Sequence, residues 1–166
     1  MSPDPRDRHK RKKAKPAVSR QVRTRPSPDD VHQIVFFRRH PEDNKSQSEP
    51  GREALNSYPL KVRSTMRAVL TAVAAAPPRR FAGGGYWEAM KGDMAGWFEV
   101  RVDGPNRHHY RLFCLLDYEA QGSDKPLLTV ITGLDKPFRT TLSDADYRRV
   151  RDLGIEYRNR NPRSVC

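Results

Sequence analysis

The sequence predicts a small α+β domain in which a strand and two helices precede an antiparallel β-meander and a final helix. Three observations lead to this fold class. An amphipathic helical repeat lies in the first half of the chain, three strand-like segments follow in the second half, and a capped helical segment comes last. We expect residues 31–160 to form the domain, residues 1–30 to be a disordered basic tail, and residues 161–166 to be a C-terminal tail.

The first half of the domain supplies a strand and the two helices. Residues 34–37 read Ile-Val-Phe-Phe, an apolar run of β-formers that predicts the first strand. A polar loop over residues 41–51 and a short helical turn over residues 52–56 follow. From Pro59, which a helix start tolerates, apolar residues recur every three or four positions as far as Pro77, and they predict an amphipathic helix.

The second half supplies the meander and the last helix. Residues 97–102, 109–116 and 127–132 are the expected strands, and residues 103–106 are the expected turn between the first two. Residues 143–160 open with a serine cap and two aspartates, as helix N-termini prefer. In the expected strand over residues 97–102, side chains alternate between the two faces, with Phe98, Val100 and Val102 on one face and Trp97, Glu99 and Arg101 on the other.

Glycines interrupt two of these segments. Residues 83–85, Gly-Gly-Gly, predict a plain connector, because no Gly-Lys-Ser/Thr ending follows them as it would in a phosphate loop. Gly154 is a possible interruption of the last helix.

The charge is strongly positive and uneven. The chain of 166 residues has 32 Lys+Arg and 20 Asp+Glu, a formal charge of +12, and residues 1–30 alone hold ten and four of these. Five of the 14 prolines also lie there, so we expect this segment to be disordered. Its run Lys10, Arg11, Lys12 and Lys13 suits binding to the phosphates of a nucleic acid without recognition of the bases. In a eukaryote the same run would be typical of a nuclear localisation signal. The alternative is a solubilising arm without a target.

Composition excludes several classes of protein. No apolar run approaches the roughly 18 residues that span a bilayer, so no membrane association is expected. The N-terminal residues are charged and contain no apolar segment of a secretory signal, and the two cysteines cannot form a disulfide framework, so a cytoplasmic location is expected. Cys114 lies in an apolar strand and is expected in the core. The adjacent His108 and His109 point to opposite faces, so we expect no metal site and no cofactor.

A basic set on the sheet and its rim remains as the candidate site. Its members are Lys91, Arg101, Arg107, Arg111, Lys136 and Arg139. Alternation places Arg101 and Arg111 opposite the apolar faces of their strands, so in an antiparallel pair both side chains can share one face. Two guanidinium groups on one face suit a phosphate chain, and they can stabilise a pentavalent phosphate during RNA cleavage by the 2′-hydroxyl. The alternative is a solvated charged face.

The ordered motifs of the meander resemble a known family. Residues 97–102 read Trp-Phe-Glu-Val-Arg-Val, residues 110–113 read Tyr-Arg-Leu-Phe, and residues 128–136 read Leu-Thr-Val-Ile-Thr-Gly-Leu-Asp-Lys. Over about residues 31–160 the chain resembles the RelE/HigB toxin superfamily, in particular the phage-derived HigB-like branch of type II toxin–antitoxin systems. The resemblance implies a RelE-like domain and a metal-independent, ribosome-associated endoribonuclease that cuts mRNA. It also implies a helix-turn-helix antitoxin as partner.

The resemblance also assigns roles to individual residues. Arg111 matches the arginine of the Tyr-Arg motif that binds the phosphate, Arg101 the basic residue of the preceding strand, and Lys136 the first lysine of a Lys-Lys motif. His108, His109 and Tyr147 are candidates for the general base, and His109 completes the expected catalytic set. The expected RNA-binding residues are Lys91, Arg107, His108, Arg139, Lys10, Arg11, Lys12 and Lys13.

The chain departs from the family pattern in four respects. Pro137 replaces the second lysine, and Leu142 stands where a proline is usual. Phe98 and Glu99 leave no second basic residue on their strand, and the N-terminal tail is an extension that compact toxins of this type lack. The alternative function is therefore a non-catalytic basic protein of a phage or mobile element that binds RNA, the ribosome or a host protein.

Overall fold

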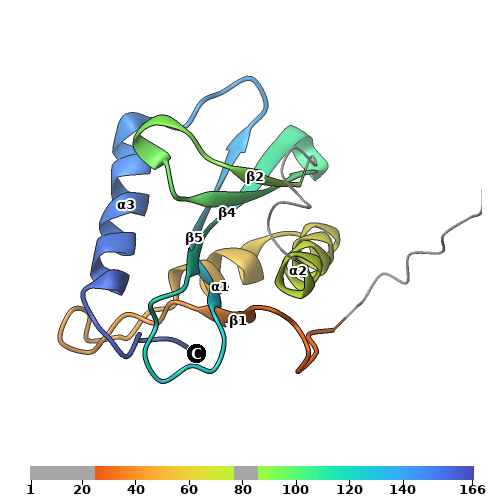
Figure 1. Ribbon diagram of the computed structural model, residues 1–166. Coiled ribbons are helices and arrows are strands. Elements are labelled where there is room, and N and C mark those ends of the chain that lie inside the picture. Colours follow the sequence, from red (N-terminus) through yellow and green to blue (C-terminus); the bar gives the residue numbers. More distant parts are fainter. Residues whose placement is uncertain (1–24, 77–85) are drawn as a thin grey trace, which may run out of the picture.

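The fold is a mixed five-stranded sheet between two helical layers (Figure 1). The computed structural model describes residues 25–76 and 86–166, so the expectations for the tail over residues 1–24 and for the connector at residues 83–85 lie outside the described residues. The elements are β1 (Gln33–Phe36), α1 (Pro50–Ser57), α2 (Leu60–Ala75), β2 (Trp87–Ala89), β3 (Phe98–Gly104), β4 (His108–Asp117), β5 (Leu127–Pro137) and α3 (Asp144–Arg158).

The predicted α+β class and the antiparallel meander are confirmed. The strand order is β1-β5-β4-β3-β2. Strand β4 pairs antiparallel with both β3 and β5, and β1 pairs parallel with β5. Residues 164–166, expected as a tail, run antiparallel beside the first strand, where Phe37 bridges Val165 and the Cys166 N–H donates to the Phe36 carbonyl at 3.0 Å. The end of the described chain therefore covers the outer edge of β1.

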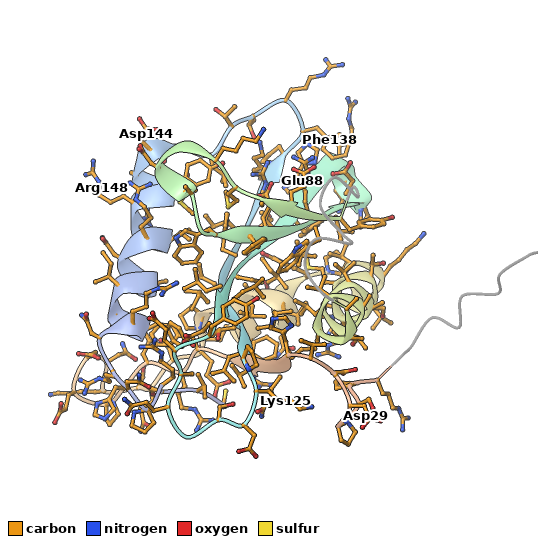
Figure 2. The ribbon with its side chains drawn as sticks, viewed as in Figure 1. Asp29, Glu88, Lys125, Phe138, Asp144 and Arg148 are labelled. Atoms are coloured by element: carbon orange, nitrogen blue, oxygen red, sulfur yellow. The ribbon has the colours of Figure 1, made fainter. Side chains whose placement is uncertain are left out.

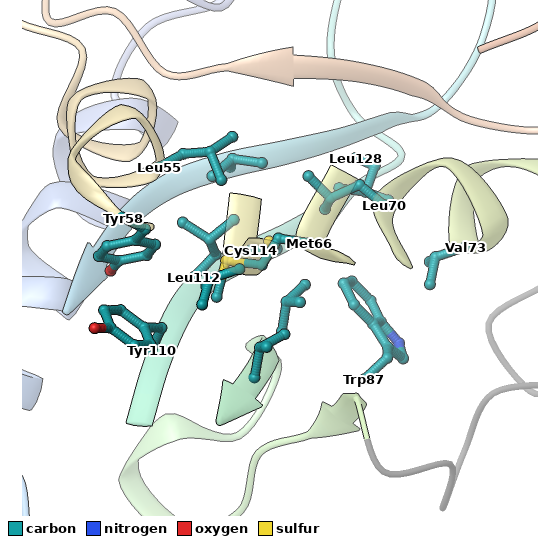
Figure 3. Packing of buried hydrophobic residues seen from close by; sticks show 14 of the residues in the cluster. Leu55, Tyr58, Met66, Leu70, Val73, Trp87, Tyr110, Leu112, Cys114 and Leu128 are labelled. Atoms are coloured by element: carbon teal, nitrogen blue, oxygen red, sulfur yellow. The ribbon is translucent and has the colours of Figure 1, made fainter. Parts of the chain in front are cut away.

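One face of the sheet packs on α1 and α2. The alternating apolar residues Val100, Val102, Tyr110 and Leu112 meet the apolar stripe of α2 there, and Figure 3 shows Tyr58 beside Tyr110 and Met66 beside Cys114. Cys114 is fully buried, and burial raises the pKa of its thiol, as expected for a core residue rather than a nucleophile.

The opposite face packs on α3. The helix begins with a capping box in which Ser143 and Asp146 bond each other's backbone N–H groups, as the serine cap predicted. The expected interruption at Gly154 is wrong, because α3 continues through it. A Cβ atom at Gly154 would lie 2.3 Å from Cζ2 of Trp97, so this glycine lets the indole ring lie against the helix backbone.

Three boundaries differ from the sequence prediction. The short edge strand β2 was not predicted, because three residues are too few to show an alternating pattern. Asp103 and Gly104 belong to β3, and the hairpin turn is made by Asn106 and Arg107, whose φ angles of 61° and 55° are those of a type I′ turn. β5 continues to Pro137, so that Lys136 lies on a strand.

Among the described residues, no helix combines the length and the apolar character needed to cross a membrane.

Candidate functional site

The four residues predicted as catalytic share one face of the sheet. Arg101 of β3 is directly opposite Arg111 of β4, and His109 of β4 is directly opposite Lys136 of β5. Directly opposed residues point to the same face, as do residues two apart on one strand, so all four lie on the face that carries α3. We call Arg101, Arg111 and Lys136 the cationic cluster.

The cluster lies at the end of this face where α3 begins, and the hydroxyl of Tyr147, on the first turn of that helix, contacts Arg111. Figure 2 shows Phe138 and Glu88 at the same end of the molecule as Asp144, the first residue of α3. Asp29 and Lys125 lie at the opposite end. Trp97 and Phe113 pack against α3 farther along the same face.

Arg111 is the most buried member of the cluster. It is 9% exposed, and its Nη1 donates to Oε2 of Glu99 at 3.0 Å and to the hydroxyl of Tyr147 at 3.4 Å. Its Nε is buried and has no hydrogen-bond partner within the described part of the chain. A buried N–H group without a partner is unfavourable, and an acceptor that supplied the missing bond would be stabilised there.

Glu99 is the counter-charge between the two arginines. Its carboxylate is buried and also lies 3.9 Å from Nη1 of Arg101. The other terminal nitrogen of Arg101 lies 3.7 Å from Glu88, and the Arg101 side chain remains 38% exposed. Like charges directly opposite each other on a sheet are destabilising, and Glu88 together with Glu99, which both guanidinium groups share, offsets the repulsion between Arg101 and Arg111.

Lys136 is the third cation of the cluster, and its pKa is lowered. Desolvation lowers the pKa of its ammonium group, and the charges of Arg111 and Arg101 lower it further. The ammonium donates to the carbonyl of Thr140, in the loop that leads to α3. An anion bound between these three cations would relieve their mutual repulsion, so the arrangement favours a phosphate or a similar oxyanion.

His109 lies beside the cluster and His108 does not. Nδ1 of His109 contacts Oδ1 of Asp103, and its ring lies 4.3 Å from the ring of Phe138, centroid to centroid. The alternation of β4 sends His108 to the other face, where Nε2 lies 3.9 Å from Oδ2 of Asp135. The expected opposite orientation of the two histidines holds, and His108 is separated from the other predicted RNA-binding residues.

Three other predicted RNA-binding residues surround the cluster. Arg107 and Arg139 are exposed on neighbouring turns that are joined by a 2.7 Å hydrogen bond from the Phe138 N–H to the Arg107 carbonyl. Both have positive φ angles, 55° and 62°, which are unusual for arginine. Lys91 lines a cavity of about 420 Å³ together with Tyr147. Residues Lys10, Arg11, Lys12 and Lys13 lie outside the described residues.

Sequence reasoning overlooked two carboxylates of the site. Glu99 was placed on the correct face but was given no role. The sequence alone does not show that its carboxylate is buried, or that Arg101 and Arg111 both approach it in the folded sheet. Asp103 was assigned to a turn, although it continues the alternation of Glu99 and Arg101 by one more step. Extending the strand by two residues would have found it.

A larger cavity, of about 820 Å³, lies at the opposite end of the molecule. Its cations are already engaged, since Arg163 is bound to the buried Asp117 at 2.7 Å and Lys125 donates to the Pro28 carbonyl. We therefore place the candidate site at the cationic cluster.

In residues 25–76 and 86–166, no three His, Cys, Asp or Glu side chains are grouped so that they could hold a metal ion. No family model, curated protein or solved structure matches the chain. The geometry of the site therefore carries the functional argument.

Proposed function

We propose that the chain is a metal-independent endoribonuclease of the RelE/HigB type, which cuts mRNA on the ribosome and is neutralised by a helix-turn-helix antitoxin. The observation that carries the proposal is the direct opposition of Arg101 and Arg111, with Lys136 on the same face of the sheet. The motifs of β3, β4 and β5, which resemble that family, support the same assignment.

The proposed reaction is attack of a ribose 2′-hydroxyl on the adjacent phosphodiester. The 2′-oxygen forms a bond to phosphorus while the bond from phosphorus to the 5′-oxygen breaks, which leaves a 2′,3′-cyclic phosphate and a 5′-hydroxyl. Negative charge accumulates on the phosphoryl oxygens in the transition state, and Arg101 and Arg111 would bind those oxygens.

The leaving 5′-oxygen needs a proton, and Lys136 is suited to supply it. An ammonium group whose pKa is lowered gives up its proton more readily than that of a free lysine. The arginines that lower this pKa are the same groups that would hold the phosphate. Binding and proton transfer are therefore electrostatically linked in the proposed site.

The surrounding basic residues suit a substrate longer than one nucleotide. Arg107 and Arg139 are exposed on the turns next to the cluster, and Lys91 lines a cavity together with Tyr147. Cations spaced around one phosphate site can contact the neighbouring phosphates of a single strand. We expect these residues to add affinity without base recognition.

The test is to induce the chain in a bacterium and map RNA 5′ ends across the transcriptome. Wild-type protein should produce new ends inside translated codons. Arg111→Lys, which keeps the charge next to Glu99 but loses the planar fork, should produce few or none. Arg67→Ala, at an exposed position of α2, is the matched control and should cleave like the wild type. Growth arrest without new 5′ ends would contradict the proposal.

The second candidate is a non-catalytic basic protein that binds RNA or the ribosome. The charge distribution favours it, because half of the net +12 lies in residues 1–30 and only the remainder in the domain. A binder of this kind would depend on the tail, whereas the proposed enzyme depends on the cationic cluster. The two functions can be distinguished by deleting the tail in one variant and substituting a residue of the cationic cluster in another.

A further inference from the structure

The environment of His109 is defined from both neighbouring strands. In the sheet it is directly opposite Asp103 on β3 and directly opposite Lys136 on β5. Arg111, two residues farther along β4, is on the same face. The charged groups that face this imidazole are therefore one carboxylate and two cations, one from each strand of the meander.

Two contacts fix the imidazole ring. Its Nδ1 is hydrogen-bonded to Oδ1 of Asp103, and the ring of Phe138 lies against it with 4.3 Å between centroids and an angle of 33° between planes. A carboxylate accepts only, so Nδ1 carries the hydrogen in the neutral ring and the lone pair is on Nε2. No hydrogen bond within the described residues involves Nε2. The ring is thus oriented, and its basic nitrogen is free.

We propose that Asp103 and His109 form a catalytic dyad, with His109 as the general base and Asp103 as the residue that positions it. This inference rests on the proposed endoribonuclease function. Nε2 of His109 takes the proton from the 2′-hydroxyl as the 2′-oxygen bonds to phosphorus, and the 5′-oxygen leaves with the proton of Lys136. The imidazolium then returns its proton to water and Lys136 regains one from water, so both groups end as they began.

The other two candidates for the base are engaged differently. His108 lies on the opposite face, with Nδ1 3.0 Å from the Asn106 carbonyl and Nε2 near Asp135. The hydroxyl of Tyr147 accepts a hydrogen bond from Arg111, so it lies beside the proposed phosphate ligand. Of the three, only His109 combines an orienting carboxylate with a free basic nitrogen on the face of the cluster.

The experiment measures single-turnover cleavage of a short mRNA on purified, programmed ribosomes. His109→Ala should lower the rate of the chemical step about 10²-fold or more, and Asp103→Asn by roughly 10-fold or more, because the amide can donate to Nδ1 and favour the wrong tautomer. The concentration of enzyme that gives the half-maximal rate should stay within about twofold. Added imidazole should restore part of the His109→Ala rate and none of the Arg111→Lys rate.

The opposite face of the same strands provides the matched control. His108 and Asp135 are also a histidine and a carboxylate at neighbouring positions of β4 and β5, but they face α1 and α2. Asp135→Asn should cleave at the wild-type rate. The ¹⁵N chemical shifts of the His109 ring should show the Nδ1–H tautomer in the wild type and in Asp135→Asn, and its loss in Asp103→Asn.

The outcomes separate this inference from the function on which it rests. Active wild-type protein whose Asp103 and His109 variants cleave normally would leave the endoribonuclease function intact and overturn the dyad. An equal loss in Asp135→Asn, or an unchanged tautomer in a slow Asp103→Asn, would also overturn it, because the effect would then be structural. Wild-type protein that cleaves no RNA would remove the proposed function and the dyad together.

Discussion

Arg101 and Arg111 stand directly opposite each other across the β3–β4 ladder, and the same buried carboxylate, that of Glu99, lies 3.9 Å from the first and 3.0 Å from the second. The arrangement is asymmetric, because the Arg101 side chain is 38% exposed and that of Arg111 only 11%. The two arginines are thus expected to contribute equally to charge but differently to folding.

The first prediction separates these contributions. Arg111→Ala leaves the buried Glu99 without its nearest cation and should lower the free energy of unfolding by about 1–3 kcal/mol, whereas Arg101→Ala should leave it nearly unchanged. Both variants should lose cleavage, because each removes a phosphate ligand. Urea denaturation and 5′-end mapping measure the two effects. Equal losses of stability would contradict the asymmetry.

The second prediction concerns anion binding. Inorganic phosphate should raise the melting temperature more than chloride at the same ionic strength, because it binds only the folded cluster. Glu99→Gln removes the internal counter-charge and should increase this difference, although the variant is less stable without phosphate. Differential scanning fluorimetry across a phosphate series is the measurement. The same response in Glu99→Gln and in Arg111→Lys would show that phosphate binds elsewhere.

The third prediction concerns the hairpin turn. Arg107 has a φ of 55°, which glycine adopts without strain, so Arg107→Gly should stabilise the fold by up to about 1 kcal/mol. The same change removes an exposed cation from the rim of the site, so RNA affinity should fall and its salt dependence should weaken. Thermal unfolding and RNA binding at several salt concentrations test both effects. A destabilised variant would mean that the Arg107 side chain supports the turn.

The fourth prediction concerns the tail. Residues 1–24 carry nine Lys+Arg and two Asp, whereas the cationic cluster is built entirely from β3, β4 and β5. Deletion of residues 1–24 should therefore keep the codon-internal cleavage pattern and mainly weaken affinity at high salt. Mapping of 5′ ends with the truncated chain is the check. Loss of all activity in a folded truncation would favour the non-catalytic binder.

The fifth prediction is a pH dependence of stability at the other end of the sheet. Burial acts to raise the pKa of Asp117, but hydrogen bonds from Arg163, Tyr157 and the Glu119 N–H outweigh it and hold the pKa below the ordinary 3.8. A carboxyl group with a lowered pKa stabilises the fold above its unfolded pKa and loses this effect as the pH falls through the folded value. Stability should therefore decline below about pH 4.

The matched variant is Asp117→Asn. It should cost about 3–5 kcal/mol at neutral pH, because the buried Arg163 loses its counter-charge. Its stability should also change less with pH in the acid range. The measurement is urea denaturation between pH 3 and pH 7. An acid decline as steep as that of the wild type would assign the effect to other carboxyl groups.

Local patterns predicted most of the elements. The spacing of apolar residues in α2, the serine cap of α3 and the alternation of β3 each depend on a few consecutive residues, and the structure confirms all three. Such local patterns did not predict the short strand β2 or the continuation of α3 through Gly154. The first is held by pairing with β3, and the second by Trp97, which is distant in sequence.

Alternation along a strand follows from backbone geometry, so the order of residues was enough to predict the fold class, the positive charge and the shared face of Arg101 and Arg111. Which residues contact one another could not be predicted in this way, because the contacts depend on how the strands pair. The register of β3, β4 and β5 brings Asp103 to His109 and places Lys136 on the opposite side of the same ring. Burial of Glu99 between two arginines likewise requires two strands, because contact and desolvation depend on neighbours that are distant along the chain.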